Sequence, residues 1–401
     1  MNFMALNNPM RLLFSWLLLL PHWALCQMYV PGQTYWSADG YIEYRCGSLP
    51  LIITAPHGGY LSPDSLPTRA CQGATTVQDG FTLELAQAID SMYALNHACR
   101  PHVIISHLHR RKLDPNRDSS EASCDDVRSM AIWRAFHGFV QTARDTVQLK
   151  HGKGILLDLH GHAHTNQRIE LGYQLTADHL RSGDSAINSG FRVQRSGIRS
   201  LVALNLGVQT HSELLRGPQA LGSWLHASGY PSVPSQQDTA PLLGEPFFSG
   251  GYITERHGSM FGGTVDAVQL EHYMTGIRNT AANRARYADT LRLVANRFLA
   301  THYFGSTAFL SACVATPIAV PFSEQPSPWF RIYPNPSSAF FVDSDLNAEL
   351  SVFDVYGKCV LRQSLAVGKQ QVSPALPAGV YLLLVEWPGQ ASGWVRWIKT
   401  Q

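Results

Sequence analysis

The sequence ILLDLHGHAH, residues 155–164, decides the fold class and indicates where the chemistry lies. Residues 155–159 are apolar except for Asp158, which is typical of a strand buried on both faces of a parallel sheet. The stretch turns polar at His160, so a histidine is expected where this strand ends. Similar apolar runs, each predicted to be a strand, occur at 51–55, 103–105 and 265–270.

Helical patterns lie between or after these runs. Apolar residues recur every three or four positions over 127–147 and again over 281–298, which predicts two amphipathic helices. Alternating β and α segments favour an α/β domain, with three α/β/α layers around a mainly parallel sheet. In such sheets, ligands bind beyond the carboxyl ends of the strands.

The composition is that of a folded protein. The chain has 401 residues, enough for two or three domains of roughly 100–200 residues each. Hydrophobic residues make up 45% and charged residues 15%, which excludes a disordered chain. A formal net charge of +2 shows no basic excess for nucleic acid. Most of the 17 histidines lie in the middle of the sequence, which places any metal chemistry there.

Residues 1–26 are predicted to form a secretory signal peptide. Arg11 precedes an apolar run that Pro21 breaks, and small residues follow near Cys26. Cys26 leaves a lipoprotein as the alternative, although Leu25 before it is large for that modification. No later apolar run approaches the roughly 18 residues of a membrane span, so none is expected in the mature chain.

Export makes disulfide bonds possible. The sequence does not specify their pairing, and the absence of a CxxC pair argues against a zinc site built from cysteines. The cysteines that remain after cleavage are Cys46, Cys71, Cys99, Cys124, Cys313 and Cys359.

The pattern changes after the main domain, which is expected at 27–312. Residues 313–329 are rich in proline and are predicted to be a linker. Short strands separated by turn residues fill 330–401, which predicts a small all-β sandwich.

Two histidines at predicted strand ends favour a shared metal. His57 leaves the run at 51–55 and precedes two glycines, and His160 follows Asp158, which could orient it. Histidine and carboxylate ligands with an open position are typical of catalytic zinc. His162 and His164 could also serve as ligands.

Two further groups could act on a substrate. Glu271 closes an apolar strand, where it is either a general base or the partner of a nearby arginine. The segment 110–117 holds three arginines and an asparagine, which is either a solvated turn or a site that binds a carboxylate. Its candidate substrate-binding residues are Arg111, Asn116 and Arg117.

Taken together, these motifs resemble the N-formylglutamate amidohydrolase family. The resemblance implies a phosphorylase/hydrolase-like fold related to zinc carboxypeptidases and a hydrolytic zinc site. The motifs occur in order over about 51–277, as APHGG at 55–59, Asp79, LDPNR at 113–117, LDLH at 157–160, GGYIT at 250–254 and VQLE at 268–271.

The resemblance implies a role for each matching residue. His57 and His160 become zinc ligands, with Asp79 as the candidate for the third ligand. Glu271 falls where carboxypeptidase-like enzymes keep the base that activates water. Arg111, Asn116 and Arg117 match the residues that hold a substrate carboxylate. His162 and His164 remain alternatives for the third ligand.

The C-terminal segment has a resemblance of its own. RIYPNP at 331–336, VFDVYGK at 352–358 and LPAGVY at 376–381 resemble a type IX secretion sorting domain. The resemblance implies a Bacteroidetes-type cell, passage through the periplasm, contact with the type IX machinery and delivery outside the cell or to its surface.

The leading hypothesis is a secreted zinc-dependent amidohydrolase that cleaves an amide bond beside a carboxylate, in an N-acyl amino acid or a peptide-like substrate. Within enzymes, the alternative is a zinc carboxypeptidase or a cell-wall peptide amidase. From another class, the alternative is a surface binding protein on a hydrolase scaffold that no longer turns over.

Overall fold

The computed structural model describes residues 29–97, 99–311, 330–333, 339–344, 347–353, 359–386 and 393–399. The chain divides into two compact units, Met1–Val314 and Ala315–Gln401. The predicted signal peptide at 1–26 and the predicted linker at 313–329 lie outside the described residues. No helix in the described ranges is long and apolar enough to cross a membrane.

An eight-stranded mixed sheet forms the centre of the first unit, with the order β1-β2-β4-β3-β5-β8-β6-β7. The strands β4, β3, β5 and β8 are parallel, and β2 and β6 pair antiparallel on either side of them. The strands are β1 (Thr34–Trp36), β2 (Ile42–Arg45), β3 (Leu51–Ala55), β4 (His102–Ser106), β5 (Gly154–Gly161), β6 (Ile169–Gly172), β7 (Ser232–Val233) and β8 (Val265–His272). The four predicted strands are thus the four parallel strands at the centre of the sheet.

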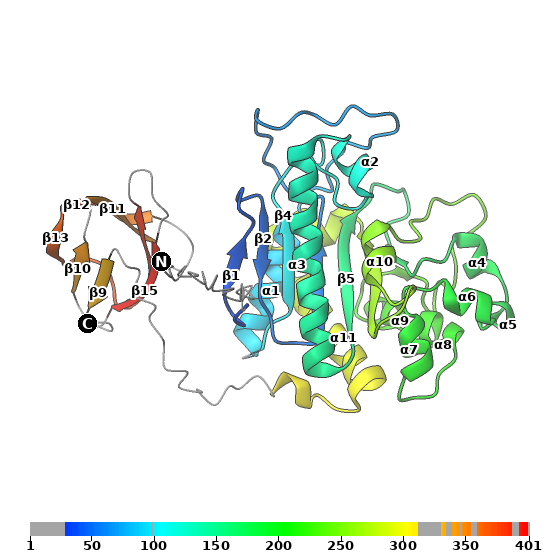
Figure 1. Ribbon diagram of the computed structural model, residues 1–401. Helices are drawn as coiled ribbons and strands as arrows, with labels where there is room; N and C mark the ends of the chain where they lie inside the picture. Colours follow the sequence, from blue (N-terminus) through cyan, green and yellow to red (C-terminus); the bar gives the residue numbers. More distant parts are fainter. Residues whose placement is uncertain are drawn as a thin grey trace, which may run out of the picture. The chain divides into compact units, whose positions relative to one another are not determined.

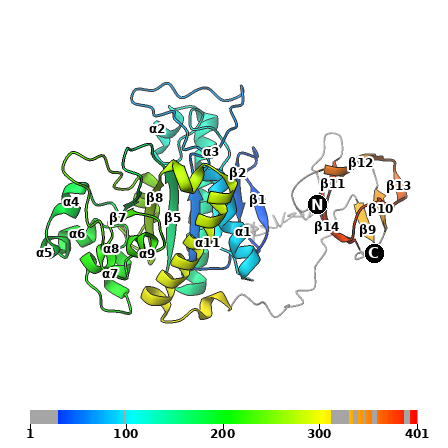
Figure 2. The ribbon, with the colours of Figure 1, turned by 180° about the vertical axis from the view of Figure 1, so that it is seen from behind.

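Helices cover both faces of this sheet. On one face lies α3 (Val127–His151), which Asp126 caps at its start and Gly152 ends in a left-handed conformation. On the other face lie α1 (Thr82–Asn96) and α11 (Ala281–Phe298), which contact each other (Figures 1 and 2). The structure therefore confirms the α/β fold class and the two helices predicted from periodicity.

Short helices surround this frame. Most of them lie in the connection between β6 and β8, which is the least regular part of the unit. The short α-helices are α2 (Ser119–Ser123), α4 (Ala177–Arg181), α5 (Asp184–Ile187), α6 (Gly190–Gln194), α7 (Arg199–Leu204), α8 (His211–Arg216), α9 (Leu221–Ala227) and α10 (Tyr252–His257).

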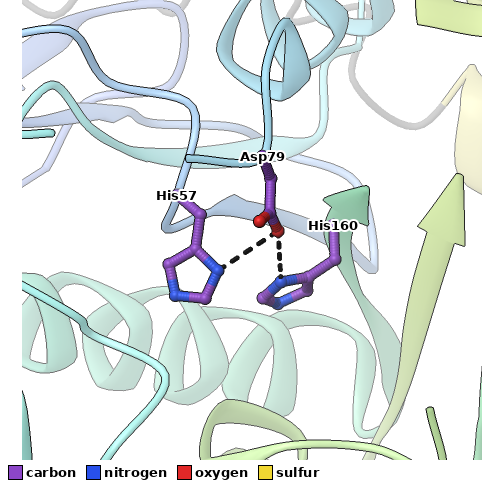
Figure 3. Close-up of side chains that lie close together, drawn as sticks. All are labelled: His57, Asp79 and His160. Carbon is purple, nitrogen blue, oxygen red and sulfur yellow. Dashed lines mark hydrogen bonds and ion pairs between the residues drawn. The ribbon is translucent and has the colours of Figure 1, made fainter. Parts of the chain in front are cut away.

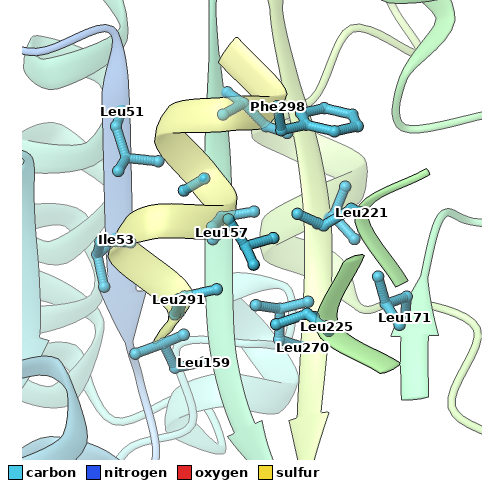
Figure 4. Close-up of a cluster of buried hydrophobic side chains, with 14 of the residues drawn as sticks. Leu51, Ile53, Leu157, Leu159, Leu171, Leu221, Leu225, Leu270, Leu291 and Phe298 are labelled. Carbon is cyan, nitrogen blue, oxygen red and sulfur yellow. The ribbon is translucent and has the colours of Figure 1, made fainter. Parts of the chain in front are cut away.

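Alternation along the strands divides the core into two layers. Leu157 and Leu159 of β5 point toward α11, where they join Leu51, Ile53 and Leu270 in a continuous apolar cluster (Figure 4). Leu156 points to the other face and packs in the cluster that includes α3. On that second face β5 continues with Asp158 and His160, so polar side chains replace the core toward its carboxyl end.

The second unit is an antiparallel β sandwich. A three-stranded sheet has the order β13-β10-β9, and a four-stranded sheet has the order β12-β11-β14-β15. Phe340 and Val372 of the first sheet share one apolar cluster with Leu350 and Leu383 of the second, which confirms the predicted sandwich. The strands are β9 (Phe330–Tyr333), β10 (Phe340–Ser344), β11 (Ala348–Phe353), β12 (Cys359–Leu365), β13 (Gly368–Val372), β14 (Gly379–Glu386) and β15 (Gly393–Lys399).

Candidate active site

The parallel strands bring the sequence-predicted site residues to one edge of the sheet. His57 follows β3, and His160 and Glu271 are Cα partners near the ends of β5 and β8. Because neighbouring residues in register point to the same face, His160 and Glu271 share the face that α3 covers. Glu170 on β6 is the next Cα partner of Glu271, so the row runs across three strands.

His57, Asp79 and His160 converge on one point (Figure 3). The Nδ1 atom of His57 lies 3.2 Å from Asp79 Oδ2, and the Nδ1 atom of His160 lies 3.1 Å from the same oxygen. The backbone N–H of Gly161 also donates to Asp79 Oδ2 at 3.2 Å. All three side chains are buried, and their candidate ligand atoms lie within 4.8 Å of one another.

A separate buried carboxylate orients each imidazole. His57 Nε2 lies 2.6 Å from Asp114 Oδ1, and His160 Nε2 lies 2.8 Å from Asp158 Oδ2. Thr54 Oγ1 donates to the other oxygen of Asp158 at 2.6 Å. Without a metal, these contacts suit imidazoles that donate from both ring nitrogens; in the tautomer that keeps only Nε2–H, donated to the carboxylate behind it, each Nδ1 would present a lone pair to a metal ion beside Asp79.

The donor set fits a divalent metal ion. In this tautomer, two Nδ1 lone pairs and a carboxylate oxygen face one another, and a cation between them would relieve their repulsion. Two ligands that each lie about 2.1 Å from zinc at tetrahedral angles are roughly 3.4 Å apart, close to the separations around Asp79. A divalent ion bound to two neutral imidazoles has a total charge of +2, the same as two imidazolium ions. The surrounding carboxylates can balance that charge in either case.

The charges in this cluster are strongly coupled. Burial alone would raise the pKa of Asp79, but the charge of His57 and hydrogen bonds from both histidines hold it well below its usual range. For His160, burial opposes protonation, yet the carboxylates of Asp158 and Asp79 raise its pKa well above the usual value. The pKa of Asp114 is likewise lowered despite burial, through His57 and Arg110. The site thus favours positive charge at its centre.

Glu271 lies beside this cluster. It is 4% exposed and accepts a hydrogen bond from Gln269 Nε2 at 2.8 Å. Burial raises the pKa of Glu271 to about 8; the charge of His160 opposes this rise, and nearby carboxylates add to it. The guanidinium group of Arg278, whose charge acts on Glu271, donates its hydrogen bonds to the backbone carbonyls of Gly80, His162 and His272.

The two alternative metal ligands lie in a second group. The side chains of His162 and His164 form one group with Glu170, and the side chain of Asp79 forms a separate group with His57 and His160. His162 already uses both ring nitrogens, with Nε2 2.9 Å from the carbonyl of Arg168 and Nδ1 accepting from the backbone N–H of His164 at 3.0 Å. Of the three candidates for the third ligand, Asp79 is the one that lies with His57 and His160.

The segment 110–117 divides between the site and the surface. Arg110 points inward, with Nε 2.9 Å from Asp114 Oδ2 and Nη1 3.4 Å from Asp79 Oδ1. Arg111 is exposed. Arg117 has a side chain that is 39% exposed, and its Nε lies 3.6 Å from Glu121 Oε2.

Asn116 is buried and holds the chain together around the site. Its Oδ1 accepts from the backbone N–H of Ile253 at 2.9 Å, near the start of α10. Its Nδ2 lies 3.4 Å from His160 Nε2 and 3.5 Å from Gln269 Oε1. Asn116 therefore links α10 and β8 to the cluster of His57, Asp79 and His160.

Several residues of this arrangement were not predicted. From the sequence, Asp114 is expected only as part of a turn or a matching motif, and no separate role is expected for Arg110 or Glu170. Asp114 lies 57 positions after His57, so no local sequence pattern connects the two residues. It could have been found only by looking for a carboxylate partner for each predicted histidine ligand. The predicted orienting role of Asp158 agrees with its contact to His160.

A disulfide bond fastens the two loops that supply Asp79 and Asp114. Cys71 and Cys124 are bonded across 53 residues, while Cys46 and Cys359 are free. Arg69 reinforces this join, donating from Nη2 to the carbonyl of Glu121 at 2.8 Å. The bond settles one pairing that the sequence left open.

Replacing Cys71 and Cys124 together by serine should destabilise the first unit. For a loop of 53 residues, loss of the cross-link is expected to lower the free energy of unfolding by about 4 kcal/mol. Urea unfolding followed by circular dichroism measures this change. Cys359→Ser is the matched control, because that thiol is exposed and free. An unchanged unfolding midpoint in the double variant would contradict the prediction.

Comparisons with known proteins place the C-terminal unit. Residues 331–392 match the family model described as a secretion system C-terminal sorting domain, as predicted. A search of curated proteins found no match.

Two solved structures are similar in part. One is PorZ, a surface component of the type-IX secretion system of Porphyromonas gingivalis, with 15% identity, a TM-score of 0.17 and coverage of 18% of this chain. The chain spans only 11% of the length of PorZ. The other is N-formylglutamate amidohydrolase from Ralstonia eutropha JMP134, with 12% identity, a TM-score of 0.39 and coverage of 68% of this chain and 99% of that one. The latter bears the name of the family that the sequence motifs resemble.

Proposed function

We propose that the first unit is a zinc-dependent hydrolase that cleaves an amide bond. The observation that carries this proposal is the convergence of the Nδ1 atoms of His57 and His160 on Asp79 Oδ2, with a buried carboxylate behind each imidazole. Pairing of each metal-binding histidine with an outer carboxylate is the usual support of a metal site. His57, Asp79 and His160 would hold a zinc ion with three protein ligands, which would leave a position for water or substrate.

The residues suggest how the reaction proceeds. A zinc ion bound here would polarise the scissile carbonyl and lower the pKa of water toward about 7. Glu271 would take the proton from the attacking water, because it lies in register with His160 on the neighbouring strand. Asp114 and Asp158 would keep both imidazoles in the tautomer that exposes Nδ1.

The experiment is a metal-reconstitution assay of the purified protein. Zinc is measured per chain, removed with a chelator and restored, while hydrolysis is followed for N-acyl amino acids, γ-glutamyl peptides and muropeptide fragments. We expect one zinc per chain and turnover of at least one of these classes that follows zinc occupancy. Stoichiometric zinc without turnover of any class would instead favour the binding-protein alternative.

The loop 110–117 supports a narrower proposal, in which the substrate carries a carboxylate near the scissile bond. Asn116 is committed to buried contacts, so the candidates in this loop are Arg111, which is exposed, and Arg117, which is half-buried and donates from Nη1 to the carbonyl of Asn116 at 2.9 Å. The pair of Arg117 with Glu121 is long and exposed, and such pairs contribute only about 0–1 kcal/mol. A substrate carboxylate could therefore displace Glu121 and bind Arg117 through two hydrogen bonds.

Replacing Arg117 by alanine should lower kcat/KM by one to three orders of magnitude, on the order of 1.4 kcal/mol per tenfold. We expect the change mainly in KM, with zinc content preserved. Glu121→Gln is the matched control, because it frees the same guanidinium group and should not weaken binding. Equal turnover of a substrate and its carboxamide analogue would remove Arg117 from substrate recognition.

We also propose that the protein is exported by the type IX machinery through its C-terminal unit. The matching family model and the predicted signal peptide at 1–26 support this proposal. In a Bacteroidetes host, the chain without 330–401 should remain in the periplasm, while the full chain reaches the surface or the medium. Immunoblots of cell fractions measure the difference, and equal export of both chains would refute the proposal.

A further inference from the structure

A second histidine–carboxylate unit lies next to Glu271. His164 Nδ1 lies 2.8 Å from Glu170 Oε1, and the other oxygen of Glu170 accepts from the backbone N–H of Phe248 at 2.8 Å. The ring of Phe248 stacks on His164 with an interplanar angle of 9° and a centroid separation of 4.8 Å. Glu170 is 1% exposed, so both its carboxylate and the plane of the His164 ring are fixed.

His162, His164 and Glu170 could also hold a metal ion, but their existing hydrogen bonds give His164 a different role. Glu170 and His164 are joined by a direct hydrogen bond, and His162, the third member of the group, already uses both ring nitrogens. A metal would have to break these contacts. The proton positions follow instead from ordinary hydrogen bonding, since a carboxylate accepts and His164 Nδ1–H donates.

The free atom of His164 is Nε2. Within the described residues this nitrogen has no recorded partner, and the side chain is 19% exposed. An imidazole whose Nδ1–H is held by a buried carboxylate, with Nε2 open, is the arrangement by which histidine moves protons in hydrolases.

The strand register places Glu170 and His160 on opposite sides of Glu271. Glu170 and Glu271 are directly opposed on β6 and β8, which puts their Cβ atoms about 4.5–5.5 Å apart. His160 flanks Glu271 on the other side, on β5. A substrate amide lying across Glu271, with its carbonyl toward His160, would therefore direct its nitrogen toward β6. The negative charge of Glu170 also acts on Glu271 and helps to raise its pKa.

We propose that His164, oriented by Glu170, donates the proton that the leaving amine requires. This inference rests on the proposed amide hydrolysis. Glu271 takes one proton from the attacking water, the carbon–nitrogen bond breaks, and the nitrogen takes a proton from His164 Nε2. The proton on Glu271 then leaves to solvent, and His164 regains one from solvent through its exposed edge. The sum is amide plus water giving carboxylic acid and amine.

Two measurements test the inference on the full chain. In the first, selective ¹⁵N-histidine labelling reports which ring nitrogen of His164 is protonated, and His164→Gln assigns the signal. We expect the Nδ1–H tautomer in the neutral form. A signal from the Nε2–H tautomer would overturn the proposal without involving turnover.

The second measurement compares leaving groups. For an amide substrate found in the panel, His164→Gln should lower kcat by about 10²–10³-fold, within the range of general acid catalysis. For the 4-nitrophenyl ester of the same acyl group, whose phenolate leaves without a proton, the loss should be less than about fivefold. Zinc content should not change. His97→Gln, at the far end of α1, is the control and should resemble the wild type.

The outcomes separate this inference from the proposed function. Equal losses on amide and ester would overturn the proton-donor role and leave the zinc hydrolase intact. No turnover of any substrate by the wild-type protein would overturn the proposed function and the donor role with it, while the ¹⁵N measurement would still establish or reject the His164–Glu170 unit.

Discussion

Replacing His160 by alanine is expected to abolish zinc binding and hydrolysis together. The cluster offers two imidazoles and one carboxylate, and catalytic zinc normally needs three protein ligands. With His160 removed, Asp79 and His57 remain as two ligands. Zinc per chain after dialysis should fall from about one to near zero, and kcat by at least about 10³-fold, as measured by elemental analysis and by the panel assay.

Asp158→Asn provides the matched control. Asp158 lies 2.8 Å from His160 Nε2 and would not touch the metal, so its loss should weaken zinc affinity by only about 10–100-fold. Circular dichroism of both variants separates loss of metal from loss of fold. Full zinc occupancy in His160→Ala would mean that the metal lies elsewhere, with His162, His164 and Glu170 as the next group to test.

The parts of the site that lie on strands could be predicted from the sequence. The runs that became β3 and β5 are apolar and short, so their carboxyl ends could be placed to within about two residues. Parallel strands end at the same edge of a sheet, and this rule alone brings His57 near His160. The Glu271 position followed in the same way from the run that became β8.

The parts that lie on loops could not be predicted from pattern. Arg110, Arg111 and Arg117 are close in one loop, yet only Arg110 contacts both Asp79 and Asp114. Which of the three side chains points inward depends on the conformation of the loop backbone, and a loop has no hydrophobic periodicity from which that conformation could be predicted. Glu170 was missed for a related reason. β6 has only four residues, and its pairing with β8 joins segments that are far apart in the sequence, so the sequence pattern does not predict it.

The second large effect is expected for Glu271→Gln, which should lower kcat by about 10²–10⁴-fold while zinc stays bound. Glutamine has nearly the same size and can still contact Gln269, so the strand and its core should be undisturbed. It cannot take a proton from water. Steady-state kinetics give kcat, elemental analysis gives zinc per chain, and isothermal calorimetry shows whether the substrate still binds.

This variant also distinguishes an enzyme from a binding protein on the same scaffold. If the first unit only binds, Glu271→Gln should leave its affinity for the ligand nearly unchanged, and there is no turnover to lose. If it hydrolyses amides, the variant should bind the substrate and hold it uncleaved. Glu271→Asp keeps the carboxylate but withdraws it by one methylene group, so its kcat should lie between those of Glu271→Gln and the wild type. Wild-type kcat in Glu271→Gln would exclude Glu271 as the base and direct the search for one to Glu170, its partner across β6 and β8.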